Sequence, residues 1–450
     1  MKARAQAVET LLRILREGAY SNLETRRVLS KGRLSVEDRG LYLNIVYGVV
    51  QNLYYLDDII GRFVNRKLSQ LDAEVLMILR TAVYQLVFLD KVPDYAVVNE
   101  AVEMTGRRAR GFINGVLRNM LRNRDTLENF DATRFRNEKD ALSVRYSLPL
   151  WIVHKYYEAY GARQAEAIIP MLNARPPFTI RVNTLKTDRE ALIRDLEALG
   201  IETAPGRLDE DALHLKQLGI FEGEIQKSEL FLQGHFTIQD QAAMMAARAL
   251  RPMPGEQVLD LCAAPGGKTT HLAQLMDNRG HIVARDVTDS RLALIDETAV
   301  RLGVKIIETQ KADGTVFVPG DAGRYDAILL DAPCSGLGIV RRKPEIRYGM
   351  DKQARRALVT IQAALLDNAA AYLRPGGRLV YSTCTVNGDE NERQVRKFLA
   401  RHPEMACLSD LDNKNTLYTN PLKDGADGFF ICALQKAGCG RRSKDLNNRV

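Results

Sequence analysis

Residues 257–270 read QVLDLCAAPGGKTT, and this stretch decides the fold of the C-terminal half of the chain. An apolar run ends in Asp260, a glycine pair follows at Gly266 and Gly267, and a helical pattern begins at Thr269. The order predicts a strand, a tight turn and a helix. Glycines let a backbone approach a ligand closely, and the free N–H groups at a helix start face it. A single Gly-rich turn can equally be a plain connector, so the rest of the chain has to decide.

From Gly234 onward, strand patterns alternate regularly with helical patterns. This alternation predicts an α/β domain with a parallel sheet covered by helices on both faces. The expected strands are 257–261, 281–285, 304–309, 326–331 and 378–383, with a last strand at 428–435 that joins the edge, and the expected helices are 268–277, 289–302, 353–373 and 389–401.

Acidic residues mark three successive strand ends of this predicted sheet. Ligands of such sheets bind at the carboxyl ends of the strands. Asp286 ends the second strand, about 20 residues after the glycine pair, where an acid accepts hydrogen bonds from ribose hydroxyls. Asp313 follows the third strand and Asp331 ends the fourth. Three acids at one rim suit a nucleoside ligand that carries positive charge.

The turn does not match the motifs that bind two classes of phosphate-bearing ligand, the nucleoside triphosphates and the dinucleotides. A P-loop requires a glycine five positions before Gly267, and Cys262 stands there. A dinucleotide fold requires GxGxxG in the first turn, which AAPGGK lacks. S-adenosylmethionine has no phosphates to hold, and its sulfonium group tolerates nearby acids. We therefore expect S-adenosylmethionine as the cofactor.

Two cysteines follow the fourth and fifth predicted strands. Cys334 lies in DAPCSG (331–336) and Cys384 lies in STCT (382–385). Neighbouring strand ends would bring both thiols to the rim that holds the cofactor. A lone cysteine is usually a small buried hydrophobe, but two of them in polar turns at adjacent strand ends favour a catalytic role.

A methyl donor beside two thiols suits methylation of cytosine at C5. This carbon is a poor nucleophile until a thiolate adds at C6 and breaks the ring conjugation. A carboxyl group near N3 would stabilise the adduct, and Asp331 is placed for that role. The C5 proton must then leave and the covalent bond must break, which requires a second group. Cys334 is the candidate for this second group.

The first 140 residues contain helical patterns and no strand pattern. Between Met104 and Arg124 the chain carries arginines and no acid, and its formal net charge is +8 with a pI of about 9.1. The run is either a solvated helix face or a patch that contacts phosphates. Its six arginines are Arg107, Arg108, Arg110, Arg118, Arg122 and Arg124.

Composition excludes several classes of protein. No apolar run approaches the length that crosses a bilayer, and the start of the chain lacks the apolar block of a signal peptide, so we expect a cytoplasmic protein without a membrane partner. Six cysteines without a CxxC pair, and histidines that do not cluster near them, argue against a zinc site or a disulfide framework. We expect no metal.

Two family resemblances cover almost the whole chain. The helices of residues 3–124 resemble the NusB-like RNA-binding module, chiefly through AVVNEAVEMTGRRARGFINGVLRNML (96–121). The motifs DLCAAPGGKTTHL, DAPCSG, RRKPEIRY and LVYSTCTVNGDENE resemble the Sun (also Fmu or RsmB) family of ribosomal RNA cytosine-C5 methyltransferases, and so does RVNTLK near the middle. Together the likeness spans residues 3–435.

The second resemblance implies a role for each motif. Cys384 is then the nucleophile, Cys334 assists release, and Lys343 lies near the base or near Asp331. The implied substrate is 16S ribosomal RNA at the family's 967-type site, and a monomer is expected. The implied cofactor contacts come from Cys262, Ala263, Ala264, Pro265, Gly266, Gly267 and Lys268, and from Asp286, Asp313 and Asp331.

These inferences predict a multidomain protein in four segments. The expected segments are a helical NusB-like domain (1–140), a helical linker with a small RRM-like α/β domain (141–235), a Rossmann-like class I methyltransferase domain (236–437) and a basic tail (438–450). The expected target cytosine is single-stranded or flipped out of a helix. Two alternatives stay open: the same chemistry on another RNA such as tRNA, and a non-catalytic RNA-binding ribosome assembly factor that retains the fold.

Overall fold

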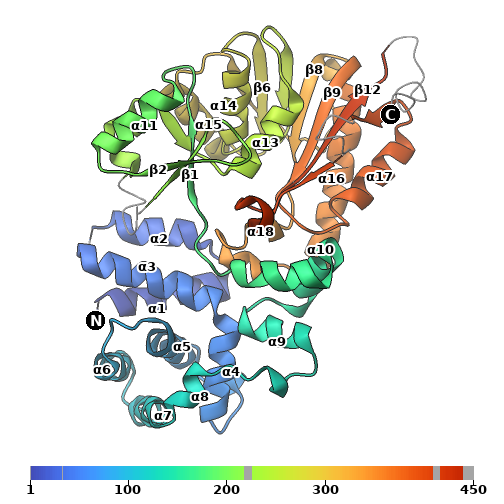
Figure 1. Cartoon of the computed structure of the whole chain (residues 1–450). Coiled ribbons are helices and arrows are strands. Elements are labelled where there is room, and N and C mark those ends of the chain that lie inside the picture. The colour runs from blue at the N-terminus through green and yellow to red at the C-terminus, as the bar shows by residue number, and fades with distance from the viewer. Residues whose placement is uncertain (1, 33, 217–224, 409–415, 439–450) are drawn as a thin grey trace. The chain divides into compact units, whose positions relative to one another are not determined.

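A computed structural model describes residues 2–32, 34–216, 225–408 and 416–438 (Figure 1). The expected basic tail therefore lies almost wholly outside the described residues. The chain forms two compact units. The first contains Met1–Arg175 together with Val340–Met350, and the second contains Pro176–Ile339 together with Asp351–Val450.

The first unit is helical, as the sequence predicts. Gly18, at φ +73°, ends the first helix, and the Ser35 hydroxyl caps the third by accepting a hydrogen bond from the Asp38 N–H at 3.2 Å. Its helices are α1 (Lys2–Glu17), α2 (Ser21–Ser30), α3 (Val36–Gln51), α4 (Leu53–Phe63), α5 (Ala73–Phe88), α6 (Asp94–Met104), α7 (Arg110–Arg122), α8 (Arg124–Glu128), α9 (Glu138–Arg145) and α10 (Leu150–Met171).

A segment from the C-terminal half of the sequence completes this unit. Residues 340–350 pack on the helices through Arg347, which is 1% exposed. The guanidinium group of Arg347 donates to the carbonyl oxygens of Gln51, Tyr146 and Leu172 at 2.9–3.0 Å. Three helix-end carbonyls therefore gain a charged donor. The strap, as we call residues 340–350, includes the expected site residue Lys343.

The second unit begins with a small antiparallel sheet in the order β2-β3-β1-β4. Ile180 and Phe236 from the sheet pack with Leu192 and Leu196 from a helix, and all four side chains are fully buried. The sequence predicts this small α/β domain. Its elements are β1 (Phe178–Val182), α11 (Arg189–Ala198), β2 (Thr203–Pro205), β3 (Ala212–Leu215), α12 (Glu229–Leu232) and β4 (Phe236–Ile238).

The larger sheet has the order β10-β12-β9-β8-β5-β6-β7, with β11 paired to β12. Strands β5 to β9 run parallel, and β12 runs antiparallel to β9. The last predicted strand thus joins beside β9, although two short unpredicted strands pair with it. The strands are β5 (Gln257–Asp260), β6 (His281–Asp286), β7 (Ile307–Lys311), β8 (Tyr325–Asp331), β9 (Leu373–Thr383), β10 (Met405–Cys407), β11 (Thr416–Tyr418) and β12 (Phe430–Lys436).

Helices cover both faces of this sheet (Figure 1). Alternate residues of one strand point to opposite layers, so Val258 packs in one apolar cluster and Leu259 in the other. The first cluster includes α13 (Gln241–Leu250), α14 (Gly267–Leu275) and α15 (Asp289–Leu302), and the second includes α16 (Lys352–Tyr372) and α17 (Glu392–Arg401). Strand order reverses between β5 and β8, and such a switch point is where ligands bind.

Across the described part of the chain, no helix is both long and apolar enough to cross a membrane.

Candidate active site

The turn between β5 and α14 and the first two residues of α14 contain the predicted residues Cys262 to Lys268. Gly266 has φ +98°, and a side chain there would come within 3.1 Å of the Ile295 Cα. Only glycine suits such a position, because it combines a left-handed backbone with a close neighbour. The turn brings the start of α14 to the carboxyl ends of the strands, as the sequence predicts.

A buried arginine that the sequence analysis did not single out braces this turn. Arg181 of β1 donates through Nη1 to the carbonyl oxygen of Gly267 at 2.7 Å and through Nη2 to the Thr270 hydroxyl at 3.1 Å. Burial lowers the pKa of Arg181 to about 9, so the group keeps its charge at neutral pH. The small sheet therefore holds the first turn of α14 in place. An arginine within the alternating strand FTIRV was the available signal.

Asp286 lies at the end of β6, as expected. Its Oδ2 accepts a hydrogen bond from the Ala264 N–H at 3.1 Å, and its Oδ1 accepts from the Val287 N–H at 2.8 Å and pairs with Arg291 at 3.1 Å. These contacts tie the acid to the glycine turn. Each carboxylate oxygen has two lone pairs, so Oδ2 keeps the capacity to accept a further hydrogen bond from a ligand.

Asp313 follows β7 and is exposed. Its Oδ1 accepts from the Thr315 hydroxyl at 2.6 Å and from the Thr315 N–H at 2.9 Å. These two hydrogen bonds lower the pKa of Asp313 and keep it ionised. Because Asp313 does not bond to the turn, its place at the strand end is the only feature that connects it with the other acids.

Asp260, which ends β5, was not among the predicted site residues. Its side chain is 1% exposed, its Oδ2 accepts from the Thr269 hydroxyl at 2.7 Å, and its Oδ1 has no hydrogen-bond partner among the residues that the structure describes. Burial raises its pKa to about 7 despite that hydrogen bond. An unpaired carboxyl oxygen inside a ligand-binding turn indicates a missing donor. The sequence carries a signal for it, because the acid ends the first strand as its neighbours end theirs.

Asp331 connects the cofactor turn with the cysteine turns. Its Oδ2 accepts from the Lys268 ammonium at 2.6 Å, and its Oδ1 accepts from the Ser382 hydroxyl at 2.8 Å. Burial disfavours the Lys268 charge, but the Asp331 carboxylate outweighs burial and raises the pKa of Lys268. Lys268 also interacts electrostatically with Cys384. A buried cation is therefore held beside the second cysteine turn.

The two cysteines predicted to be catalytic lie in contact. The Sγ atoms of Cys334 and Cys384 are 3.3 Å apart, close enough for a thiol–thiolate hydrogen bond. This hydrogen bond and burial raise the pKa of the Cys334 thiol well above its usual range. Cys262 lies in the glycine turn, where burial raises the pKa of its thiol. Within the described residues, Cys334 and Cys384 are the thiols at the carboxyl ends of β8 and β9.

Lys343 lies in the strap, which belongs to the first unit. Three of the four predicted catalytic residues, Asp331, Cys334 and Cys384, lie in the second unit. The described chain holds no cluster of His, Cys, Asp and Glu that could bind a metal ion.

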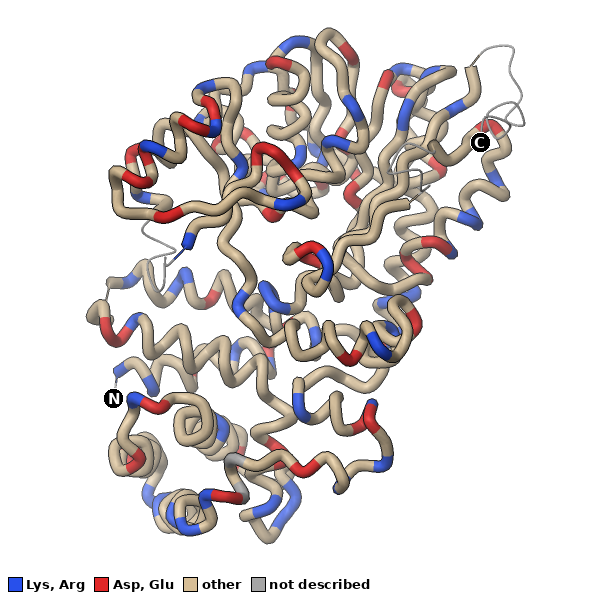
Figure 2. Tube along the Cα trace, viewed as in Figure 1, with Lys and Arg blue, Asp and Glu red and all other residues tan. Residues whose placement is uncertain are grey.

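The predicted arginine run of the first unit is exposed. Lys and Arg recur along α7 in Figure 2. Arg124 pairs with Asp94 at 2.6 Å, and Arg110 donates to the Thr105 carbonyl oxygen at 3.2 Å. The described residues include no ion-pair partner for the remaining four, Arg107, Arg108, Arg118 and Arg122.

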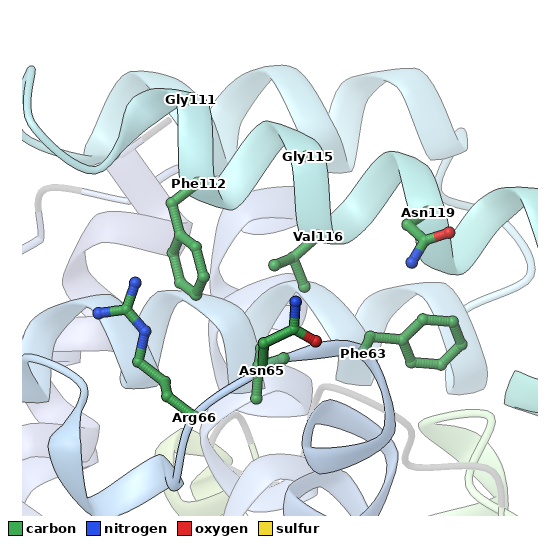
Figure 3. Close-up of a pocket in the computed structure, with 9 residues that line it drawn as sticks. Phe63, Asn65, Arg66, Gly111, Phe112, Gly115, Val116 and Asn119 are labelled. Atoms are coloured by element: carbon green, nitrogen blue, oxygen red, sulfur yellow. The ribbon is translucent and has the colours of Figure 1, made fainter.

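Helix α7 also borders a surface cavity of about 330 Å³ (Figure 3). Phe63, Asn65 and Arg66 from the end of α4 line it opposite Phe112 and Asn119 from α7. The Arg66 guanidinium lies 5.1 Å from the centre of the Phe112 ring. None of the predicted catalytic or cofactor residues lines this cavity, so we do not place the chemistry there.

The strand-end residues fit S-adenosylmethionine. The unpaired Oδ1 of Asp260 and the remaining acceptor capacity of Asp286 suit a ligand that brings hydroxyl or ammonium donors. The glycine turn offers backbone rather than a phosphate-binding side chain. Sheet order, turn and acids together define a class I, S-adenosylmethionine-dependent methyltransferase.

Three family models match consecutive parts of the chain. Residues 247–435 match the 16S rRNA methyltransferase RsmB/F model, residues 1–122 match the NusB family, and residues 148–220 match the ferredoxin-like domain of RsmF/B-like methyltransferases. They confirm the NusB-like start, the small α/β domain and the methyltransferase domain that the sequence predicts.

Individual relatives match over nearly the full length. The probable ribosomal RNA small subunit methyltransferase B of Bacillus subtilis (strain 168) is 37% identical over 96% of this chain and 98% of its own. The protein of the same name from Synechocystis sp. is 34% identical over 97% of this chain and 100% of its own. The crystal structure of PH0851 matches 96% of this chain and 99% of its own, with 29% identity and a TM-score of 0.78. The crystal structure of NSun6 from Pyrococcus horikoshii with SFG matches 64% of this chain and 98% of its own, with 26% identity and a TM-score of 0.57.

The chain belongs to the RsmB/F family of 16S ribosomal RNA methyltransferases. Its methyl donor is S-adenosylmethionine, and its helical first domain is of the NusB type.

Proposed function

We propose that this protein methylates C5 of a cytosine in 16S ribosomal RNA, at the family's 967-type site, through a covalent bond between Cys384 and C6. One observation supports this proposal above all. Two thiols from adjacent strand ends lie 3.3 Å apart, beside an ion pair of Lys268 and Asp331. Methylation of a ring nitrogen or a ribose oxygen needs no thiol, whereas methylation of this unreactive carbon needs a nucleophile and a second group.

Cys384 is the proposed nucleophile. The thiolate is the reactive form, and a nearby cation favours it. Lys268 supplies that cation, since its ammonium is buried, held by Asp331 and electrostatically coupled to Cys384. The new S–C6 bond places an electron pair on C5. S-adenosylmethionine supplies, when bound, the methyl group that C5 takes up, with S-adenosylhomocysteine as the second product.

Cys334 is the proposed group for release. After methyl transfer the C5 proton leaves to a base, the electron pair of that C–H bond restores the C5–C6 double bond, and the S–C6 bond breaks to return the Cys384 thiolate. Once Cys384 is bonded to C6, the hydrogen bond that chiefly raises the pKa of Cys334 is lost, so Cys334 can release its own proton to solvent. Its thiolate is then within reach to accept the C5 proton, because the two sulfurs are in contact. Asp331, held by Lys268 and Ser382, is the proposed partner of the cytosine ring at N3.

Cofactor binding is assigned to the strand ends. We propose that the turn Cys262–Lys268 contacts S-adenosylmethionine through its backbone, that Asp286 accepts from the ribose hydroxyls, and that Asp313 and Asp331 complete the site. Asp260 joins this set because its buried Oδ1 lacks a donor. Lys343 is proposed to contact the base or Asp331 when RNA is bound.

The exposed arginines and the small antiparallel sheet are proposed to hold the RNA around the target base. A cytosine inside a helix is out of reach of a buried thiol, so the base must be unpaired or flipped out. Phosphate contacts by Arg107, Arg108 and their neighbours would supply affinity that falls with salt. The NusB-type domain in a 16S rRNA methyltransferase favours ribosomal RNA over tRNA as the substrate.

A trapping experiment tests the assignment of the two cysteines. Incubation of the Cys334→Ser variant with 16S rRNA and S-adenosylmethionine should accumulate a protein–RNA adduct that survives a denaturing gel, because release is blocked after the bond forms. Cys384→Ser should form none. An adduct from Cys384→Ser and none from Cys334→Ser would reverse the roles.

Bisulfite sequencing tests the substrate. Total RNA from cells with and without this gene should differ at one cytosine of 16S rRNA, because a 5-methylcytosine resists deamination. A difference confined to tRNA would favour the alternative substrate. Identical maps would favour a non-catalytic assembly factor.

A further inference from the structure

A carboxylate outside the predicted site lies behind the two cysteine turns. Glu390, in the loop between β9 and α17, is fully buried. Its Oε2 accepts from the Ser335 N–H at 2.8 Å and from the Gln362 amide at 3.0 Å. Its Oε1 accepts from the Ser335 hydroxyl at 2.5 Å and from the Asn387 amide at 2.8 Å. Four donors thus saturate the lone pairs of both oxygens.

These contacts join the two turns to each other. Ser335 directly follows Cys334, and its hydroxyl oxygen accepts from the hydroxyl of Thr385, which directly follows Cys384, at 2.7 Å. The Gly338 N–H donates to the Cys384 carbonyl oxygen at 2.9 Å. Removal of Glu390 would leave buried donors on both turns without an acceptor, and the distance between the sulfurs would lose its main support.

Glu390 has no ion-pair partner within the described residues, so its charge is stabilised by neutral donors alone. A buried charge of this kind is costly to keep. The Glu390 charge raises the pKa of Cys334 in addition to the larger contributions of the Cys384 hydrogen bond and burial. Lys268 acts on the other sulfur. The thiol pair therefore lies between a negative group on the Cys334 side and a positive group on the Cys384 side.

We propose that Glu390 is a positioning residue for the methyl transfer: it locks the two cysteine turns together, and its charge disfavours the thiolate form of Cys334, so that Cys384 acts as the nucleophile. This inference rests on the proposed roles of the two cysteines. It explains why two adjacent thiols differ in function, since the charges around them are opposite in sign. No bond to the substrate is assigned to Glu390.

The groups that face the pair come from several elements. Cys334 faces Cys384, Glu390 and Tyr381, and the Tyr381 hydroxyl donates to the Glu390 carbonyl oxygen at 2.6 Å. Burial raises the pKa of Tyr381 well above its usual value, so Tyr381 stays neutral. Cys384 faces Cys334 and Lys268, and Lys268 is paired with Asp331. Below about pH 10, Glu390 is therefore the acid whose removal should alter Cys334 most.

Alkylation by iodoacetamide tests the inference without RNA or cofactor. Site-resolved mass spectrometry of the full-length protein would give the pH dependence of alkylation for each thiol. In the wild type, alkylation of Cys334 should require a pH above that usual for a thiol, because its pKa is raised. In a Cys384→Ser background, which removes the coupling between thiols, Glu390→Gln should move the Cys334 profile to lower pH by about one unit. An unmoved profile would overturn the electrostatic part of the proposal.

Two further variants separate charge, geometry and folding. Glu392→Gln removes an exposed acid two positions away and should leave both profiles unchanged. Ser335→Ala keeps the Glu390 charge but removes the hydroxyl between the turns, so it should lower kcat while the Cys334 profile stays in place. If Ser335→Ala kept full activity, the locking role would be wrong. This variant removes a single hydroxyl, which keeps the test valid if Glu390→Gln fails to fold.

Kinetics complete the test. Glu390→Gln should lower kcat for methylation on the order of 100-fold, as expected for misplaced reacting groups, with the KM for S-adenosylmethionine unchanged. If the KM for S-adenosylmethionine rose by the same factor as kcat fell, the site would be generally damaged, and a positioning role would be contradicted. If Cys334→Ser traps no adduct while the alkylation profile still shifts, the proposed function fails and the electrostatic inference stands. If an adduct is trapped but the profile does not move, the proposed function stands and the electrostatic inference fails.

Discussion

The second unit contains two pairs of neighbouring thiols, and only one of them is placed for chemistry. Cys334 and Cys384 lie 3.3 Å apart, and Cys407 of β10 and Cys432 of β12 lie 3.9 Å apart. In each pair one thiol has a raised pKa, first through the hydrogen bond to its neighbour and then through burial. Distance and burial therefore do not distinguish the pairs.

The surroundings distinguish them. Charged groups act on the first pair, with Lys268 on Cys384 and Glu390 on Cys334. In the described part of the chain, Cys407 and burial raise the pKa of Cys432, and Cys432 packs within an apolar cluster. The first pair ends two parallel strands, whereas the second lies within paired antiparallel edge strands. A cysteine becomes a candidate nucleophile through fixed charges at an open strand end rather than through a nearby sulfur.

The largest expected effect comes from replacing one thiol of each pair. Cys384→Ser should lower methylation of 16S rRNA by more than about 1,000-fold, because the C5 carbon loses its activating nucleophile. Cys407→Ser should keep the wild-type rate, since that pair packs against apolar side chains. A radiolabelled methyl-transfer assay measures both. Equal losses would show that the two pairs do not differ as described.

Asp286→Ala tests whether the acids at the strand ends bind the cofactor. Loss of hydrogen bonds from a charged acceptor should weaken S-adenosylmethionine binding about 10–100-fold in calorimetry. Asp289→Ala is the matched control, since Asp289 is exposed and pairs only with Lys311 at the surface. The assignment of Asp286 would be withdrawn if both variants bound the cofactor as the wild type does.

Asp260 ends β5, which pairs with β8, so it is a pH-dependent group at the sheet edge where the first thiol pair also lies. Its pKa is about 7 in the folded protein and about 3.9 when unfolded, so between these values the folded state alone keeps the proton. Its contribution to the free energy of unfolding is then lost as pH rises, on the order of 1 kcal/mol per pH unit up to about pH 7. Denaturant titrations should show this fall for the wild type and a smaller one for Asp260→Asn. If the free energy of unfolding of the two proteins changed with pH in the same way, the raised pKa would not belong to Asp260.

The smallest expected effect concerns charges that lie outside the second unit altogether. Joint replacement of Arg107, Arg108 and Arg110 by glutamine should weaken RNA binding several-fold at physiological salt, and it should reduce the slope of log K against log salt by about 2, because each phosphate contact contributes about 0.7 on single strands. Filter binding at several salt concentrations measures the slope.

A control of equal charge sharpens this test. Replacement of Arg16, Arg26 and Lys31, which are also exposed in the first unit, changes the net charge by the same amount. It should leave the slope near that of the wild type. If both triple variants changed the slope equally, the arginine run would be an ordinary solvated face.

Much of the fold followed from the sequence because its signals are local. Apolar runs closed by Asp286 or Asp331 mark buried strands that end at a polar rim, and Gly266 marks the turn whose left-handed backbone other residues avoid. Once the strands are parallel, their ends must meet, so the proximity of Cys334 and Cys384 was predictable as well. Family models confirm the three-domain architecture.

The remaining features depend on contacts between distant residues. Arg181 reaches Gly267 across 86 positions, and Glu390 reaches Ser335 across 55. The strap belongs to the helical unit because Arg347 contacts carbonyl groups that lie far away in the sequence, in one case 296 positions. No periodic pattern in the sequence predicts which distant residues will contact each other. Each is a polar residue in a buried place, and only the folded structure shows which donor or acceptor satisfies it.

Peptide mapping of the trapped complex tests the central claim most directly. After Cys334→Ser is incubated with 16S rRNA and cofactor, digestion with nuclease and protease should leave a methylated cytidine nucleotide attached to the peptide that contains Cys384. Mass spectrometry would identify the modified residue and the base. A nucleotide on any other residue, or methylated RNA that forms without an intermediate at Cys384, would contradict the account.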